Sequence, residues 1–180
     1  RSSGLNRFLD RSDGGFVSGG VGGGEGLVLL GTTRGNVIAL ALSDGSEKWR
    51  TYVGSEIGST PVAAQGRVFA QTIDGELVAL DAETGEQLWS YSSQVPLLTL
   101  RGTSTPVTAR DVVYAGFASG KVVALRASIG EPIWEQRVML PEGRSELERI
   151  VDVDSAPLVV GNAVYGQAYQ GRLMRIVARD

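Results

Sequence analysis

Runs of β-branched and aromatic residues recur along the chain, and glycine-containing turns separate them. The clearest pairs are RVFAQTI with GELVALDA, separated at Asp74-Gly75, and DVVYAGFA with GKVVALRA, separated at Ser119-Gly120. Such runs, bounded by turn residues, predict short antiparallel strands joined by hairpins. A row of βαβ units is the alternative, but no helical stretch of useful length separates the runs.

The runs belong to a larger repeat. Three segments share an Ala-Leu start, a glycine at the seventh place and a tryptophan at the eleventh: ALALSDGSEKW (39–49), ALDAETGEQLW (79–89) and ALRASIGEPIW (124–134). Pro61 lies 28 residues before Trp89, and Pro106 lies 28 residues before Trp134. A β-sandwich would not predict such matched intervals. The repeat therefore predicts an all-β fold, a β-propeller of four-stranded antiparallel blades.

The blade units are constant in length, and the joints between them are not. The units cover approximately residues 17–50, 57–91, 103–137 and 154–180, the last incomplete. The first joint has 12 residues from Trp49 to Pro61, whereas the equivalent intervals in the second and third joints have 17 and 23. We expect the second joint (90–105) and the third joint (135–156) to carry inserted binding residues.

Each complete unit ends in a tryptophan, at Trp49, Trp89 and Trp134. We expect each tryptophan to pack between neighbouring blades, since its large flat surface would set the angle between them. Stacking on a ligand is the alternative, which regular recurrence in every unit disfavours. The turn before each tryptophan strand contains a glycine, which supplies the positive φ of a tight turn: Gly45, Gly85 and Gly130.

The amino-acid composition excludes several kinds of catalytic and metal-binding site. The chain has no cysteine and no histidine, which excludes thiol nucleophiles, disulfides, imidazole metal ligands and the usual general base near neutral pH. The net charge is −3, and the 17 Lys and Arg residues are scattered, so we expect no nucleic-acid partner. The longest apolar runs are too short to cross a bilayer, so an export signal or lipid anchor is expected outside this segment.

The second joint contains PLLTL, an unusually apolar sequence for a connection between strands. If the segment is extended, Leu98 and Leu100 share one face, and Thr99 and Arg101 share the other. Two leucines beside an arginine predict a small apolar contact surface with a polar rim. A local plug over the end of a blade is the alternative interpretation.

The third joint contains GRSELERIVDVDSAP (143–157). Ser145 and Glu148 form a capping-box pattern, which predicts a single helical turn across 145–150. The alternating VDVD that follows predicts that two valines point inward and two carboxylates outward. The outward pair would be Asp152 and Asp154.

Consecutive joints of a propeller emerge on the same face, so the two insertions are expected to be neighbours. One docking patch for a protein partner would then contain Leu98, Leu100, Arg101, Asp152 and Asp154. An ion pair between Arg101 and either aspartate is an alternative that is compatible with docking. A calcium site at the aspartates is a further alternative, but it lacks the additional oxygens and the glycine of a calcium loop, so no metal and no cofactor are predicted.

ALDAETGEQLW resembles the tryptophan-docking motif of quinoprotein-type propellers, and nearly the whole chain resembles the BamB family of outer-membrane assembly lipoproteins. The most specific segments are LTLRGTSTPV, IWEQRV and GRSELERIVDVDSAP. The resemblance implies a ring of about eight blades, of which three to four are present here, so the chain is expected to be about half of a longer protein. It also implies that the five patch residues match positions used for binding in this family.

The function implied by this resemblance is that of a non-catalytic scaffold on the periplasmic face of the outer membrane, lipid-anchored in its full-length form. The implied partner is the set of POTRA domains of the barrel-inserting subunit BamA, with other subunits reached through it and nascent outer-membrane proteins as further candidates. A fragment of a dehydrogenase that uses pyrroloquinoline quinone (PQQ) and a PQQ-like sensor propeller are the alternatives. Such dehydrogenases typically place paired cysteines by the cofactor, and this chain has none.

Overall fold

The computed structural model describes residues 16–93, 103–140, 150–169 and 173–177, and these residues form strands and no helix. Blade 1 contains β1 (Val17–Gly24), β2 (Leu27–Thr32), β3 (Asn36–Ala41) and β4 (Glu47–Tyr52). Blade 2 contains β5 (Val62–Ala64), β6 (Arg67–Gln71), β7 (Glu76–Asp81) and β8 (Gln87–Ser92). Blade 3 contains β9 (Val107–Ala109), β10 (Val112–Phe117), β11 (Lys121–Arg126) and β12 (Pro132–Arg137). Blade 4 contains β13 (Leu158–Val160), β14 (Ala163–Gln167) and β15 (Leu173–Val177).

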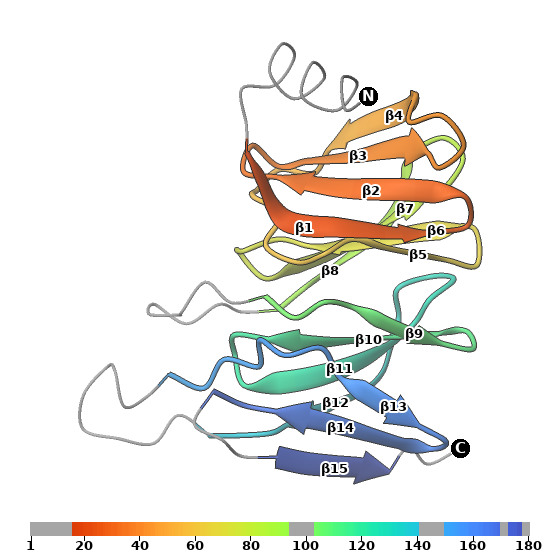
Figure 1. Cartoon of the computed structure of the whole chain (residues 1–180). Helices are drawn as coiled ribbons and strands as arrows, with labels where there is room; N and C mark the ends of the chain where they lie inside the picture. The colour runs from red at the N-terminus through yellow and green to blue at the C-terminus, as the bar shows by residue number, and fades with distance from the viewer. Residues whose placement is uncertain (1–15, 94–102, 141–149, 170–172, 178–180) are drawn as a thin grey trace.

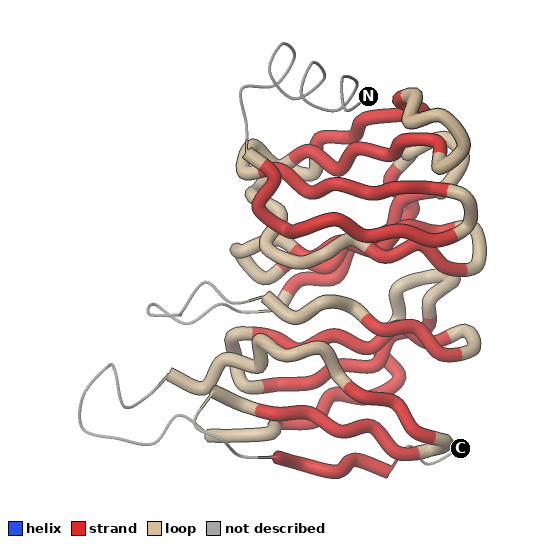
Figure 2. The backbone as a smooth tube through the Cα atoms, in the orientation of Figure 1, coloured by secondary structure: helices blue, strands red, loops and turns tan. Residues whose placement is uncertain are grey.

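Within each blade, every strand pairs with its successor in an antiparallel ladder, so each blade is a simple meander. The sheets follow one another in chain order and pack face against face, from blade 1 at one end to blade 4 at the other (Figures 1 and 2). The prediction of four-stranded antiparallel blades is therefore confirmed.

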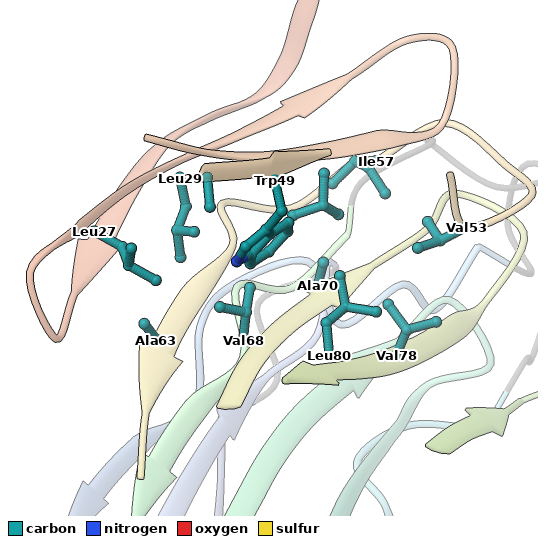
Figure 3. Packing of buried hydrophobic residues seen from close by; sticks show 12 residues of the cluster. Leu27, Leu29, Trp49, Val53, Ile57, Ala63, Val68, Ala70, Val78 and Leu80 are labelled. Carbon is teal, nitrogen blue, oxygen red and sulfur yellow. The ribbon is translucent and has the colours of Figure 1, made fainter. Parts of the chain in front are cut away.

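The core lies between the sheets. The third strands β3, β7 and β11 each have four consecutive buried residues, so side chains on both faces of these strands are buried. This double burial explains why the strands read as continuous apolar runs. Figure 3 shows the core between blades 1 and 2, where Trp49, Leu29 and Ile57 meet Val68 and Leu80.

The repeat is visible at the level of single residue pairs. In each complete blade the tryptophan pairs with the alanine of the Ala-Leu start, and the register shifts at the next residue: Ala39 with Trp49, Ala79 with Trp89 and Ala124 with Trp134. Such irregularities re-aim a side chain relative to the sheet. The shared spacing of the sequence motif thus corresponds to a shared local geometry.

Glycines let the first strands of blades 1 and 2 approach closely. A Cβ atom on Gly19 would lie 2.1 Å from the carbonyl oxygen of Ser59, and one on Gly22 would lie 1.8 Å from that of Pro61. Any side chain at these positions would push β1 away from the residues around β5. The Gly-rich sequence of β1 is therefore a packing requirement of this pair of blades.

The helical turn predicted across 145–150 falls almost entirely outside the described residues, and Ile150 is not helical. In the part of the chain that the structure describes, no helix is long and apolar enough to cross a membrane.

Candidate functional site: the joints between the blades

The three joints begin at equivalent places. In each, the first residue after the fourth strand donates its backbone N–H to the glycine that ends the turn between the second and third strands: Val53 to Gly35 (2.9 Å), Ser93 to Gly75 (2.9 Å) and Val138 to Gly120 (2.8 Å). Because these turns lie at the same end of each blade, the joints start on one face of the molecule.

The first and third joints also end in the same way. The carbonyl oxygen five residues before the blade-opening proline accepts a backbone hydrogen bond from the next blade: Glu56 from Ile73 (3.0 Å) and Asp152 from Tyr169 (2.9 Å). The next residue donates its N–H to the preceding blade: Ile57 to Thr32 (3.1 Å) and Val153 to Phe117 (3.2 Å). Joints of different length therefore follow one path where they enter the space between two blades.

The structure describes two of the five predicted docking residues. Leu98, Leu100 and Arg101 lie outside the described residues. Asp154 is exposed, in agreement with the predicted direction, but Asp152 is fully buried, so the prediction that its carboxylate points outward is wrong. Residues 151–154 are not a strand, and the two-residue alternation of a strand does not apply to them.

Val151 and Val153, in contrast, are buried as predicted. Asp152 is buried between them because this part of the joint passes between blades 3 and 4, at the place that Glu56 occupies in the first joint.

Trp49 and Trp89 each contact the next blade. The Trp49 indole N–H donates to the Ala82 carbonyl oxygen at 2.9 Å, and the Trp89 indole N–H donates to that of Ala127 at 3.0 Å. Each ring lies against the turn glycine of that blade, since a Cβ atom on Gly85 or Gly130 would be 2.6 Å from the indole ring. Gly45, the third predicted turn glycine, has a φ of +74° and open space where a Cβ atom would be.

Trp134 has a different environment. Its ring packs against Tyr114 with centroids 6.0 Å apart and planes inclined by 46°. It is half-buried and lines two cavities between blades 3 and 4, of about 330 and 180 Å³. Ile176 and Val177 line the larger cavity, and Val159 and Val164 line the smaller one.

A chain of contacts on the opposite edge of the blades was not predicted. The Glu25 carboxylate accepts the Gly66 N–H at 2.9 Å, and the Gln65 side-chain amide donates to the Arg110 carbonyl oxygen. Glu25, Gln65 and Arg110 have φ values of 53°, 56° and 54°, an unusual backbone region for residues other than glycine. The three residues occupy equivalent positions just before the second strand of their blades. An alignment of the repeat units could have identified them by this shared position.

A hydrogen bond to a carboxylate joins the outer strands of blades 2 and 3. Glu135 on β12 accepts a hydrogen bond from the Tyr91 hydroxyl of β8 at 2.6 Å and lies 2.8 Å from the Lys121 ammonium of β11. The hydrogen bond from Lys121, followed by that from Tyr91, lowers the pKa of Glu135. Burial, reinforced by the hydrogen bond to Glu135, raises the pKa of Tyr91. Within the described ranges, no group of three or more acidic residues is arranged to hold a metal ion.

Comparison with known proteins places the chain in a family. The family model described as outer membrane protein assembly factor BamB matches residues 4–180. The chain is 42% identical over 156 residues to the outer membrane protein assembly factor BamB of Nitrosomonas eutropha, which covers 87% of this chain and 38% of that protein. It matches the crystal structure of BamB from Moraxella catarrhalis with a TM-score of 0.85 and 31% identity, over 89% of this chain and 49% of the other.

A europium-containing methanol dehydrogenase also matches, with a TM-score of 0.64 and 19% identity over 86% of this chain and 36% of that enzyme, which shows a shared fold alone. The chain spans less than half the length of the relative from Nitrosomonas eutropha and about half of the Moraxella catarrhalis chain. The match over nearly the whole chain, together with the repeated blade geometry, shows that the chain belongs to the BamB family of outer membrane protein assembly factors.

Proposed function

We propose that the chain is part of a non-catalytic scaffold that assists the folding and insertion of β-barrel proteins at the periplasmic face of the outer membrane. In this proposal its joint face binds the POTRA domains of the barrel-inserting subunit BamA, and a lipid anchor holds the intact protein at the membrane. The observation that carries the proposal is that all three joints start on one face of the molecule. The residues inserted in the two longer joints would therefore lie side by side on that face.

The blades supply the rigid frame, and the second and third joints supply the contacts. Leu98 and Leu100 would form the apolar centre of the surface, with Arg101 and the exposed Asp154 at its rim. Asp152 contributes in another way, because a fully buried side chain cannot touch a partner directly. We assign it to holding the third joint between blades 3 and 4.

A scaffold is favoured over a quinoprotein dehydrogenase. The relative from Nitrosomonas eutropha, at 42% identity, is named an assembly factor, whereas the dehydrogenase shares the fold at 19% identity. The chain contains no cysteine, so it cannot supply the paired cysteines typical of those cofactor sites.

The test is the double variant Leu100→Ala with Arg101→Ala in the intact protein. We expect the thermal midpoint to stay unchanged and the affinity for isolated POTRA domains to fall by about 2 kcal/mol or more, roughly thirtyfold in Kd, because both changes remove interface anchors. Binding would be measured by titration calorimetry. The control is Leu42→Ala with Arg126→Ala, which removes an exposed leucine and arginine at the opposite ends of the strands. Undiminished binding by the first variant would contradict the docking assignment.

A further inference from the structure

The described ends of the three joints contact one another in chain order. Gly58, near the end of the first joint, lies against Thr103 of the second, since a Cβ atom on Gly58 would be 2.8 Å from Thr103 Cγ2. Ser104 of the second joint in turn donates its hydroxyl proton to the Ser155 carbonyl oxygen of the third joint at 3.0 Å. The joints are therefore linked to one another where they return to the blades, as well as through the sheets that they connect.

The side chain of Ser104 is fully buried, so the position of its hydrogen-bond partner matters. A buried hydroxyl without a hydrogen bond is destabilising, and a serine hydroxyl has a single proton to donate. The carbonyl oxygen of Thr105, the next residue in the chain, lies at 3.4 Å, whereas that of Ser155 lies at 3.0 Å. The shorter contact is therefore the one that crosses from the second joint to the third, over 51 residues of sequence.

Ser59 provides a comparison, because it occupies the equivalent position in the first joint. Ser59 and Ser104 each lie two residues before the proline that opens the next blade, and both are buried. The Ser59 hydroxyl oxygen accepts the Gln71 N–H at 3.0 Å and so bonds within blade 2. Ser59 thus ties its joint to the blade that the joint enters, whereas Ser104 reaches the following joint.

The link reaches the third joint beside Asp154. Ser155, whose carbonyl oxygen Ser104 holds, directly follows Asp154 in the chain. On the other side of Asp154, the Val153 N–H donates to the carbonyl oxygen of the last residue of β10 at 3.2 Å. The Val153 side chain also packs on blade 3, since a Cβ atom on Gly116 would lie 2.5 Å from its Cγ1 atom. The backbone is therefore held on both sides of Asp154.

Asp154 itself is exposed, whereas the three residues before it are buried. In the part of the chain that the structure describes, no ion pair involves Asp154, so its carboxylate is available to a partner. A backbone that is already held on both sides loses less conformational freedom on binding than a free loop does. The electrostatic complement of an exposed carboxylate is a basic side chain. The end of the third joint therefore presents one negative charge at a fixed place.

We propose that Ser104 is a positioning residue for Asp154. By holding the Ser155 carbonyl oxygen, it fixes the described end of the third joint against that of the second. This contact keeps the Asp154 carboxylate in place for a basic side chain on the surface of the partner. The inference rests on the proposed function, in which Asp154 lies at the rim of the docking surface. Ser104 is buried and cannot touch the partner, so it acts through Asp154.

Hydrogen exchange tests the positioning without any partner. In the intact protein, Ser104→Ala removes the bond with little change in volume, so the Val153 amide should exchange faster by about fivefold or more. The Ile57 amide of the first joint makes the equivalent bond to Thr32 and serves as the internal reference, which should not change. Ser59→Ala is the matched control, and it should leave the exchange of the Val153 amide as it is. An unchanged rate at Val153 in Ser104→Ala would overturn the proposal.

A double-mutant cycle connects the position of Asp154 with binding. Asp154→Asn should weaken binding to isolated POTRA domains by about fivefold, the usual upper value for an exposed ion pair. Ser104→Ala should weaken binding by about twofold to fivefold on its own and have no further effect in the Asp154→Asn background, because it acts through that carboxylate. Ser59→Ala should bind as tightly as the wild type. Equal weakening by Ser104→Ala in both backgrounds would show that Ser104 does not act through Asp154.

The two measurements also separate this inference from the proposed function. If Asp154→Asn weakens binding while Ser104→Ala changes neither the affinity nor the exchange at Val153, the role of Ser104 is wrong and the proposed function stands. If Asp154→Asn binds as tightly as the wild type, the place of Asp154 in the docking surface is wrong, and so is the part of the inference that concerns binding. The exchange at Val153 then still decides whether Ser104 holds the third joint.

Discussion

The junction between blades 1 and 2 and the junction between blades 2 and 3 are built from the same repeat, yet they are braced differently. Trp49 is 7% exposed, its N–H is bonded to Ala82, and its ring covers Gly85. Thr51, two residues further along β4, adds a hydrogen bond of 2.7 Å to the Gly85 carbonyl oxygen. In the second junction Trp89 is half-buried, its N–H is bonded to Ala127, and the Tyr91 hydroxyl, two residues further along β8, donates to Glu135 at 2.6 Å.

The comparison shows which part of a junction is constant and which part varies. In both junctions the tryptophan contacts the turn between the third and fourth strands of the next blade. The residue two positions beyond the tryptophan differs, since Thr51 bonds to that turn and Tyr91 bonds to a carboxylate on the fourth strand of the next blade. The contact between tryptophan and glycine is therefore shared by the two junctions, and the second contact is specific to each.

The largest expected effect separates the two tryptophans. Trp49→Ala should destabilise the protein by about 3–5 kcal/mol, the usual loss for a buried large aromatic side chain. Trp89→Ala should cost less, about 2 kcal/mol, because a half-buried side chain removes less apolar surface from water. Urea unfolding followed by circular dichroism measures both. Equal losses would show that the burial of the tryptophan does not decide its contribution to the junction.

A smaller effect tests the contribution of the turn glycine to stability separately from that of the tryptophan. Gly85 and Gly45 have nearly the same φ, +75° and +74°, so alanine should cost about 1 kcal/mol of backbone strain at either position. At Gly85 the new methyl group would also meet the Trp49 ring at 2.6 Å, whereas at Gly45 it would enter open space. We expect Gly85→Ala to cost about 1–3 kcal/mol more than Gly45→Ala, by the usual effect of overpacking. A difference near zero in urea unfolding would contradict the docking role of Gly85.

Much of this architecture is predictable from the sequence because it repeats. Equal intervals from Pro61 to Trp89 and from Pro106 to Trp134 reflect one local geometry, so strands, turns and blades follow from spacing alone. The spacing does not predict which residue of the next blade each tryptophan contacts. The ring of Trp49 reaches Gly85 in the next unit, a contact that depends on how two sheets stack.

The joints were harder to predict because they follow no regular period. The outward direction predicted for Asp152 assumed an extended strand, and the joint instead passes between two blades. The contact of Gln71 could not be predicted for a related reason: its buried side-chain amide donates to the Gly116 carbonyl oxygen of blade 3 at 2.9 Å, and this partner depends on how the two sheets stack.

The smallest predicted effect concerns the junction between blades 2 and 3, where Glu135 accepts a hydrogen bond from Tyr91 of blade 2 and pairs with Lys121 within blade 3. The pKa of Glu135 is lowered in the folded protein, so its contribution to stability is present above the unfolded pKa of about 4.3 and is lost as the pH falls through the folded value. The site is partly exposed and screened by solvent, which limits this contribution to about 1 kcal/mol or less. Glu135→Gln should therefore lower the free energy of unfolding slightly at pH 7 and make no difference well below the folded pKa.

Urea unfolding from pH 7 to pH 3 would measure this convergence. Glu47→Gln is the matched control, because Glu47 pairs with Arg50 at 3.1 Å within a single strand of blade 1 and joins no two blades. If the cross-blade contact stabilises the junction, Glu135→Gln should also increase the exchange of amide protons at the outer edges of both blades 2 and 3, whereas Glu47→Gln should affect blade 1 alone. A gap between Glu135→Gln and the wild type that stays constant down to pH 3 would mean that ionisation of Glu135 plays no part in closing this junction.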